Sequence, residues 1–164
     1  MQNKKTLFLA QGAMIAAIYV ALTYVFAPFS FKEVQVRIAE ALTILPVFTP
    51  AAIPGLFIGC VIGNIVGGAV LPDVVFGSLA TLIGAFFTWK LRHAHPFLAP
   101  VPPILSNMII VPFVLRYAYG VELPIPLMML TVGIGEVLSC GVLGLILYYA
   151  LRGKKDQIFR VGED

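Results

Sequence analysis

The stretch IAEALTILPVFTPAAIPGLFIGCVIGNIVGGAV, residues 38–70, decides the fold of this chain. It is apolar apart from Glu40, Asn64 and a few threonines, and three prolines interrupt it. A single helix of this length would extend ~50 Å at 1.5 Å per residue, whereas the hydrocarbon core of a bilayer is ~30 Å thick. We therefore predict two short spans, about 37–49 and 53–71, that separate at the proline-containing segment TPAAIPG.

The composition of the whole chain indicates an integral membrane protein. Of its 164 residues, 60% are hydrophobic and 12% are charged, whereas a soluble domain carries about 25% charged residues. Four further apolar runs predict spans at about 6–27, 74–90, 104–119 and 126–151. The predicted fold class is therefore an all-α transmembrane bundle of six helices in a single domain.

The segments between the predicted spans are too short for a soluble catalytic or ATP-binding domain. No Walker-type glycine loop occurs, and no set of catalytic residues has a recognisable spacing. We therefore expect no enzyme activity and no cofactor in this chain. Any energy for uphill transport would come from a partner or from an ion gradient.

The positions of lysine and arginine predict the orientation. A multi-pass protein of the cell membrane with both termini in the cytoplasm places eight of these residues inside and three outside, in agreement with the positive-inside rule. A five-span chain with its N-terminus outside gives the same division, so only the length of residues 38–70 favours six spans. We expect the LPD segment (71–73) to form a tight turn between the third and fourth spans.

Polar side chains inside apolar spans are the candidate binding residues, because charged groups at membrane depth are costly and usually functional. Helix rise places four of them, from four different helices, in the outer half of the membrane or at its midplane. These are Glu40, Asn64, Asn107 and Glu136, with Gln35, Arg37, Asp73 and Arg116 at the outer rim. We expect the four deep residues to converge in one cavity that opens to the outside.

Carboxylates outnumber cations in the predicted outer half, which favours a cationic or donor-rich solute. Carboxylates and carboxamides together suit the edge of a purine-like ring, which offers adjacent donors and acceptors. A structural role is the alternative: Arg37 and Glu40 would form an i,i+3 pair, and Glu136 would pair with Arg116 to hold two helices together.

Small residues recur at helical spacing in two spans. Gly55, Gly59, Gly63 and Gly67 form a ridge that we expect to pack within the bundle, because small residues allow close helix approach in lipid. Ala13, Ala17 and Ala21 share one face of the first span and form a candidate docking surface for another membrane protein. Cys60 and Cys140 lie inside apolar runs and are expected to be small packing residues.

Four segments carry a resemblance to a known family: VQVRIAEALTILPVFTPAAIPGLFIGCVIGN (34–64), DVVFGSLATLIGA (73–85), ILSNMIIVPFVL (104–115) and VGIGEVLSCGVLG (132–144). Nearly the whole chain resembles the QueT family. Members of that family are substrate-binding S components of energy-coupling-factor (ECF) transporters, associated with queuosine precursors. The motif that runs from Gln35 to Asn64 is long and specific.

The resemblance implies partnership with a transmembrane coupling protein and two cytosolic ATPases, which use the ATP. It implies that the S component binds solute outside, topples in the membrane and releases the solute inside. Small residues on the first helix, here Ala13, Ala17 and Ala21, would dock the coupling protein. The connections at 28–37, 71–74 and 116–125 would cover a solute of the deazapurine type, such as aminomethyl-deazaguanine or queuine.

This hypothesis assigns roles without choosing between the carboxylates. Glu136 or Glu40 would accept from the base edge, Asn64 and Asn107 would fix its carbonyl and ring nitrogens, and Asp73 or the other glutamate would meet an ammonium group. A ring from Phe29, Phe31 or Tyr117 would stack on the base. The alternatives are an S component for another cationic vitamin-like solute such as thiamine, or a non-transporting membrane scaffold or enzyme.

Overall fold

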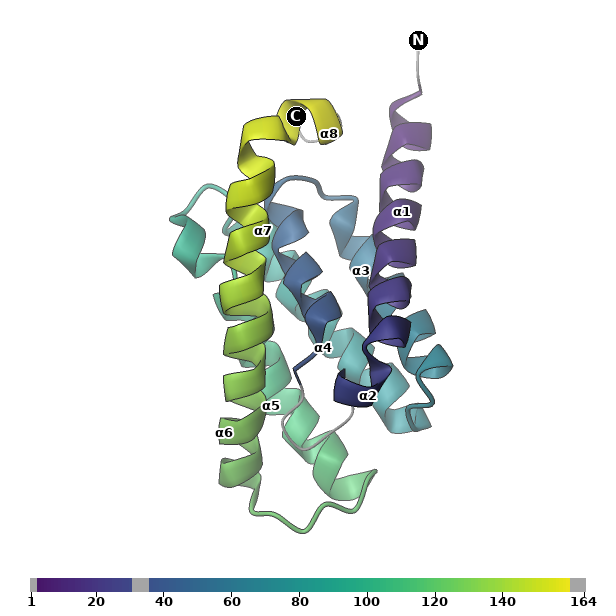
Figure 1. Cartoon of the computed structure of the whole chain (residues 1–164), viewed down its shortest axis with the longest axis vertical. Coiled ribbons are helices and arrows are strands. Elements are labelled where there is room, and N and C mark those ends of the chain that lie inside the picture. Colours follow the sequence, from purple (N-terminus) through teal and green to yellow (C-terminus); the bar gives the residue numbers. More distant parts are fainter. Residues whose placement is uncertain (1–2, 31–35, 160–164) are drawn as a thin grey trace.

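The computed structural model describes residues 3–30 and 36–159, and every regular element in that part of the chain is a helix (Figure 1). Among these, η1, η2 and η4 are 3₁₀ helices, and η3 is a π-helical segment between α6 and α7. The elements are α1 (Lys4–Val25), α2 (Ala27–Ser30), η1 (Ile38–Val47), α3 (Ala52–Val66), α4 (Leu71–Lys90), η2 (Pro96–Leu98), α5 (Val101–Tyr117), α6 (Ile125–Glu136), η3 (Val137–Leu143), α7 (Gly144–Leu151), η4 (Arg152–Lys154) and α8 (Lys155–Ile158).

The proline-rich stretch divides into two helices at the predicted place. Pro46 lies near the end of η1, where its missing N–H and its ring are incompatible with continued α-helix. Pro50 lies in the connection between η1 and α3, and Pro54 lies in the first turn of α3, where proline is tolerated. The buried Thr49 hydroxyl accepts from the N–H of Ala51 at 3.3 Å and stabilises the connection.

Four helical segments are long and apolar enough to cross a membrane, which confirms a membrane protein with several spans. They are Lys4–Val25, Leu71–Lys90, Pro96–Tyr117 and Ile125–Ile158. The two remaining apolar helices, η1 and α3, have 10 and 15 residues, so each extends only about 20 Å. Whether both count as spans, and on which side the termini lie, stays a prediction.

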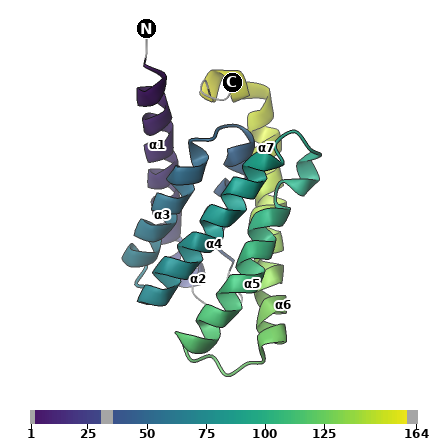
Figure 2. The same ribbon diagram turned by 180° about the vertical axis from the view of Figure 1, so that it is seen from behind.

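In chain order, α1, η1, α3, α4, α5 and α6 alternate in direction along the long axis of the molecule (Figure 1). As a result, α1 begins and α8 ends at the same end of the molecule. Seen from behind, α1, α3, α4, α5 and α6 follow one another as neighbours (Figure 2). The 3₁₀ helix η1 occupies the centre, where it contacts α1, α3, α4, α7 and η3. Residues of η1 are therefore placed where side chains from most of the bundle can reach them.

Three of the four glycines of the predicted ridge, Gly55, Gly59 and Gly63, pack within the bundle as predicted. A Cβ on Gly55 would lie 2.7 Å from the backbone oxygen of Gly12, and one on Gly59 would lie 2.9 Å from the Cβ of Tyr19. A Cβ on Gly63 would lie 3.2 Å from the Oγ1 of Thr23. The ridge thus brings α3 into backbone contact with α1.

The predicted turn at residues 71–73 is wrong. Leu71 begins α4, and Pro72 and Asp73 belong to its first turn. Proline is favoured there because its missing N–H would have no partner, and a carboxylate is favoured by the helix dipole. The fifth predicted span also begins too late, since α5 begins at Val101 and ends at Tyr117.

Candidate solute-binding site

The 3₁₀ pitch of η1 aligns polar residues that an α-helix would separate. With three residues per turn, side chains at i and i+3 eclipse one another. Arg37, Glu40 and Thr43 therefore form one row, and the N–H of Glu40 donates to the carbonyl of Arg37 at 2.9 Å. All three side chains are buried, so this row faces the inside of the bundle.

An acidic cluster surrounds Glu40 and is formed by Tyr19, Glu40, Asn107, Glu136 and Cys140. The Tyr19 hydroxyl donates to Glu40 Oε1. The Asn107 amide donates to Glu136 Oε2 at 3.0 Å, and the Cys140 thiol lies 3.1 Å from the same oxygen. Glu40, Glu136 and Asn107 are only 1%, 3% and 4% exposed. The acidic cluster is thus closed off from solvent in this conformation.

The two glutamates of the acidic cluster are close neighbours from distant parts of the chain. One ligand atom each from Glu40, Glu136 and Cys140 lie within 4.8 Å of one another. The π-helical segment η3 begins directly after Glu136 and carries Cys140, and such wide turns recur at functional sites. Two carboxylates at this spacing favour a ligand that brings positive charge or several hydrogen-bond donors.

A second polar group, the rim pair, joins η1 to the start of α4. Arg37 Nη2 lies 3.5 Å from Asp73 Oδ2, which also accepts from the Tyr119 hydroxyl at 2.8 Å. The Asn64 amide donates to the backbone oxygen of Asp73 at 3.4 Å. Burial, aided by the Asp73 carboxylate, raises the pKa of Tyr119 to about 12, so its hydroxyl remains a donor at neutral pH.

Tyr119→Phe is expected to loosen the contact between the start of α4 and the loop after α5. The change removes the bond to Asp73 and the acceptor for the N–H of Val70, so we expect the melting temperature in detergent to fall by roughly 2–4 °C. Tyr117→Phe is the matched control, because Tyr117 is 78% exposed. Equal melting temperatures for both variants would contradict the structural role of Tyr119.

The structure brings together most, but not all, of the predicted site residues. Glu40, Asn107 and Glu136 meet in the acidic cluster, whereas Asn64 lies with Asp73 and Arg37 at the rim pair. Tyr117 is exposed and lines an apolar hollow with Phe76 and Phe113. Gln35 and Phe31 lie outside the described residues.

The structural alternatives considered from the sequence are not the contacts observed. Arg37 forms an ion pair with Asp73, and no ion pair joins Arg37 to Glu40 in the described part of the chain. Within the described chain, no ion pair joins Glu136 to Arg116, whose guanidinium instead lies 3.4 Å from the carbonyl of Val121. The interior glutamate is therefore held by neutral donors.

Sequence reasoning missed three contributors to the site. Tyr19 and Tyr119 hold the carboxylates of Glu40 and Asp73, although tyrosines in apolar surroundings predict ordinary packing. Cys140 is buried as expected, but its thiol contacts Glu136 rather than apolar neighbours alone. Gly12, Tyr19 and Thr23 lie on one buried face of α1. Their helical spacing was the sequence pattern that could have indicated an inward-facing Tyr19.

Several buried acceptors in this region have no partner among the residues that the structure describes. They are Glu40 Oε2 and Asp73 Oδ1, together with the hydroxyl oxygens of Ser78 and Ser139. An unsatisfied buried polar atom costs about 1–3 kcal/mol. A ligand with several N–H donors would remove that cost, so the arrangement is suited to bind a polar solute.

Four apolar helical segments of membrane length surround buried carboxylates, two of which keep an oxygen without a partner among the described residues. The chain belongs to the QueT transporter family, since the model of that family matches residues 9–153. It is thus a member of a transporter family and not an enzyme.

One curated relative is described as the queuosine precursor transporter QueT of Lactococcus lactis subsp. cremoris (strain MG1363). It is 33% identical over 85 residues, which cover 51% of this chain and 50% of the relative. The alignment therefore spans about half the length of each protein. No solved structure matches the chain.

Proposed function

We propose that this chain is the membrane-embedded S component of an ECF transporter that binds a queuosine precursor of the 7-deazaguanine type. The observation that carries the proposal is the acidic cluster, whose two carboxylates approach within 4.8 Å inside a bundle of the QueT family. A guanine-like edge presents adjacent ring N–H and amino donors, which a carboxylate accepts in pairs. An aminomethyl group would add the positive charge that a second carboxylate favours.

The geometry supports the following roles for individual residues. Glu40 and Glu136 would accept from the base edge and the ammonium group, and Asn107, already bonded to Glu136, would orient that carboxylate. Asp73 has one oxygen without a partner among the described residues and would offer a further acceptor toward the outer rim. With the termini in the cytoplasm, as the charge distribution predicts, the rim pair would face the exterior.

Isothermal titration of the purified protein with aminomethyl-deazaguanine and with queuine tests the proposal. We expect saturable one-to-one binding at micromolar ligand or below. The two glutamates and Cys140 could also bind a divalent cation. The titration is therefore repeated after dialysis of the protein against EDTA, and we expect precursor binding to be unchanged. Absence of binding for both precursors would contradict the assignment, and tighter binding of thiamine in the same panel would favour the vitamin-like alternative.

The proposed transport cycle requires docking to a coupling protein, and the alanine face of α1 is available for it. Ala13, Ala17 and Ala21 are exposed, whereas Ala16 and Tyr19 pack inward. Ala17→Leu is expected to reduce co-purification of the coupling protein and ATPases at least about tenfold, because bulk at a small-residue face prevents close helix approach.

Ala150→Leu is the matched control for that experiment. Ala150 is also an exposed helical alanine, but it lies on α7. We expect its complex to form normally. If both variants recover equal amounts of the coupling protein and ATPases, the proposed docking role of α1 is contradicted. The proposal for solute binding would not be affected by that result.

A further inference from the structure

The end of the molecule that carries the chain termini contains a basic pocket far from the acidic cluster. The hollow measures about 420 Å³. Its polar lining is formed by Arg92, His93, Arg152, Lys155 and Asp156, and its apolar lining by Val47, Phe48, Tyr148 and Phe159. Three permanent cations thus face one carboxylate across a floor of aromatic rings.

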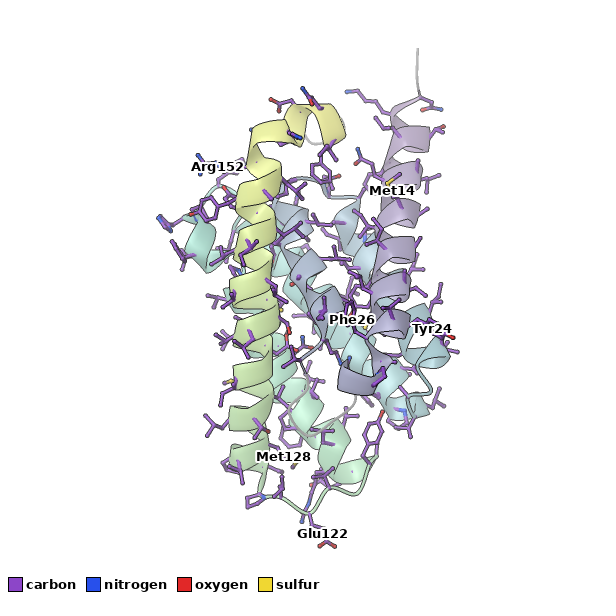
Figure 3. The ribbon with its side chains drawn as sticks, in the orientation of Figure 1. Met14, Tyr24, Phe26, Glu122, Met128 and Arg152 are labelled. Atoms are coloured by element: carbon purple, nitrogen blue, oxygen red, sulfur yellow. The ribbon has the colours of Figure 1, made fainter. Side chains whose placement is uncertain are left out.

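The chain folds back to build this pocket. After α7, the short helix α8 turns across the end of the bundle, where Figure 3 shows Arg152. Phe159 is buried and stacks on Phe48, with ring centroids 5.4 Å apart, and Phe48 stacks on Tyr148 at 5.3 Å. The Gln11 amide of α1 also lies 3.4 Å from the carbonyl of Ile158. These contacts anchor the end of α8 to α1 and to Phe48.

The two arginines of the pocket contact aromatic rings and a backbone carbonyl. Arg92 lies 4.4 Å over the Trp89 ring and donates to the Trp89 carbonyl at 2.9 Å, and Arg152 lies 5.5 Å from the Tyr149 ring. Among residues 3–30 and 36–159, no ion pair joins Asp156 to Arg152 or Lys155. Positive charge without a carboxylate partner beside an apolar floor is suited to an amphiphilic anion.

We propose that this basic pocket binds a phosphate group, and that the headgroup of an anionic phospholipid is its occupant. The aromatic floor would contact the glycerol and upper acyl region, and Arg92, Arg152 and Lys155 would contact the phosphate oxygens. A soluble phosphate compound would make the same contacts with the cations, but it has no apolar part that the aromatic floor could bind. This site is independent of the solute site proposed above.

Native mass spectrometry of the detergent-purified protein with phosphatidylglycerol and with phosphatidylcholine tests the lipid. The test variant is Arg152→Glu with Lys155→Glu. The control is Lys90→Glu with Lys154→Glu, which changes the net charge equally at positions that do not line the pocket. We expect one phosphatidylglycerol to bind wild type and control alike, and the test variant to bind about tenfold more weakly or worse.

A parallel titration with pyrophosphate distinguishes the two sources of phosphate. A contrasting outcome is that the wild type binds pyrophosphate, loses this binding in the test variant, and shows no preference for phosphatidylglycerol over phosphatidylcholine. That result would support an anion site but overturn the lipid as its occupant in favour of a soluble phosphate compound. Equal weakening of phosphatidylglycerol binding in both double variants would overturn the proposal, because the cations would then act only as general surface charge. Absence of binding by both probes at millimolar concentration would overturn it as well.

Discussion

Glu136→Gln is expected to weaken precursor binding by about 30-fold or more while the protein remains folded. The change removes a carboxylate next to Glu40 that would accept from the ligand, and charge-assisted hydrogen bonds contribute about 1.5–3 kcal/mol each. Glutamine still offers an oxygen to the Asn107 amide, which donates to this side chain at 3.0 Å. Isothermal titration gives the affinity, and thermal unfolding in the same detergent reports the fold.

Glu122→Gln is the control for that measurement. Glu122 is exposed at the tip of the loop between α5 and α6, remote from the acidic cluster (Figure 3). Glu122→Gln makes the same chemical change far from the acidic cluster, so it controls for the change in the composition of the protein alone. If Glu136→Gln binds as tightly as Glu122→Gln, Glu136 has only a structural role.

Gly55→Leu is expected to give the largest loss of stability in the chain. Even a Cβ would lie 2.7 Å from the Gly12 oxygen and 3.2 Å from its Cα, and these backbone atoms cannot move aside without separating α1 from α3. Overpacking of this kind costs typically 1–3 kcal/mol and occasionally more. We expect a lower melting temperature and a reduced yield of monodisperse protein in detergent.

Gly153→Leu provides the comparison for the glycine ridge, since no heavy atom lies within 4 Å of a Cβ built there. Its melting temperature should stay close to that of the wild type. A Gly55→Leu protein as stable as Gly153→Leu would show that α1 and α3 do not depend on this contact.

The sequence predicts the course of residues 38–70 because proline chemistry is local. Pro46, Pro50 and Pro54 restrict their own backbone and that of their neighbours, so the position of the break follows without tertiary information. Helix depth likewise predicts that Glu40 and Glu136 can meet, because it places both in the outer half of the membrane or at its midplane. The prediction that the two glutamates approach each other needs little more than an up-and-down arrangement of the helices.

Other features depend on packing and could not be predicted. The 3₁₀ pitch of η1 and the π-helical turn of η3 arise where these two elements contact one another, and neither has a strong sequence signature. Which of the two tyrosines, Tyr117 or Tyr119, reaches the rim pair depends on where α5 ends. Sequence patterns locate helix ends only to within one or two residues, and a shift of that size decides whether a side chain contacts the rim pair or lies on the outer surface.

The tight winding of η1 also sets the axial reach of the central segment. Its ten residues extend about 5 Å farther than they would with α-helical rise. Rewinding to α pitch would shorten the segment by that amount and rotate successive side chains by about 20° less per residue. Arg37, Glu40 and Thr43 would then fan out around the axis, so a change of pitch alone would dismantle the inward row without unfolding any neighbouring helix.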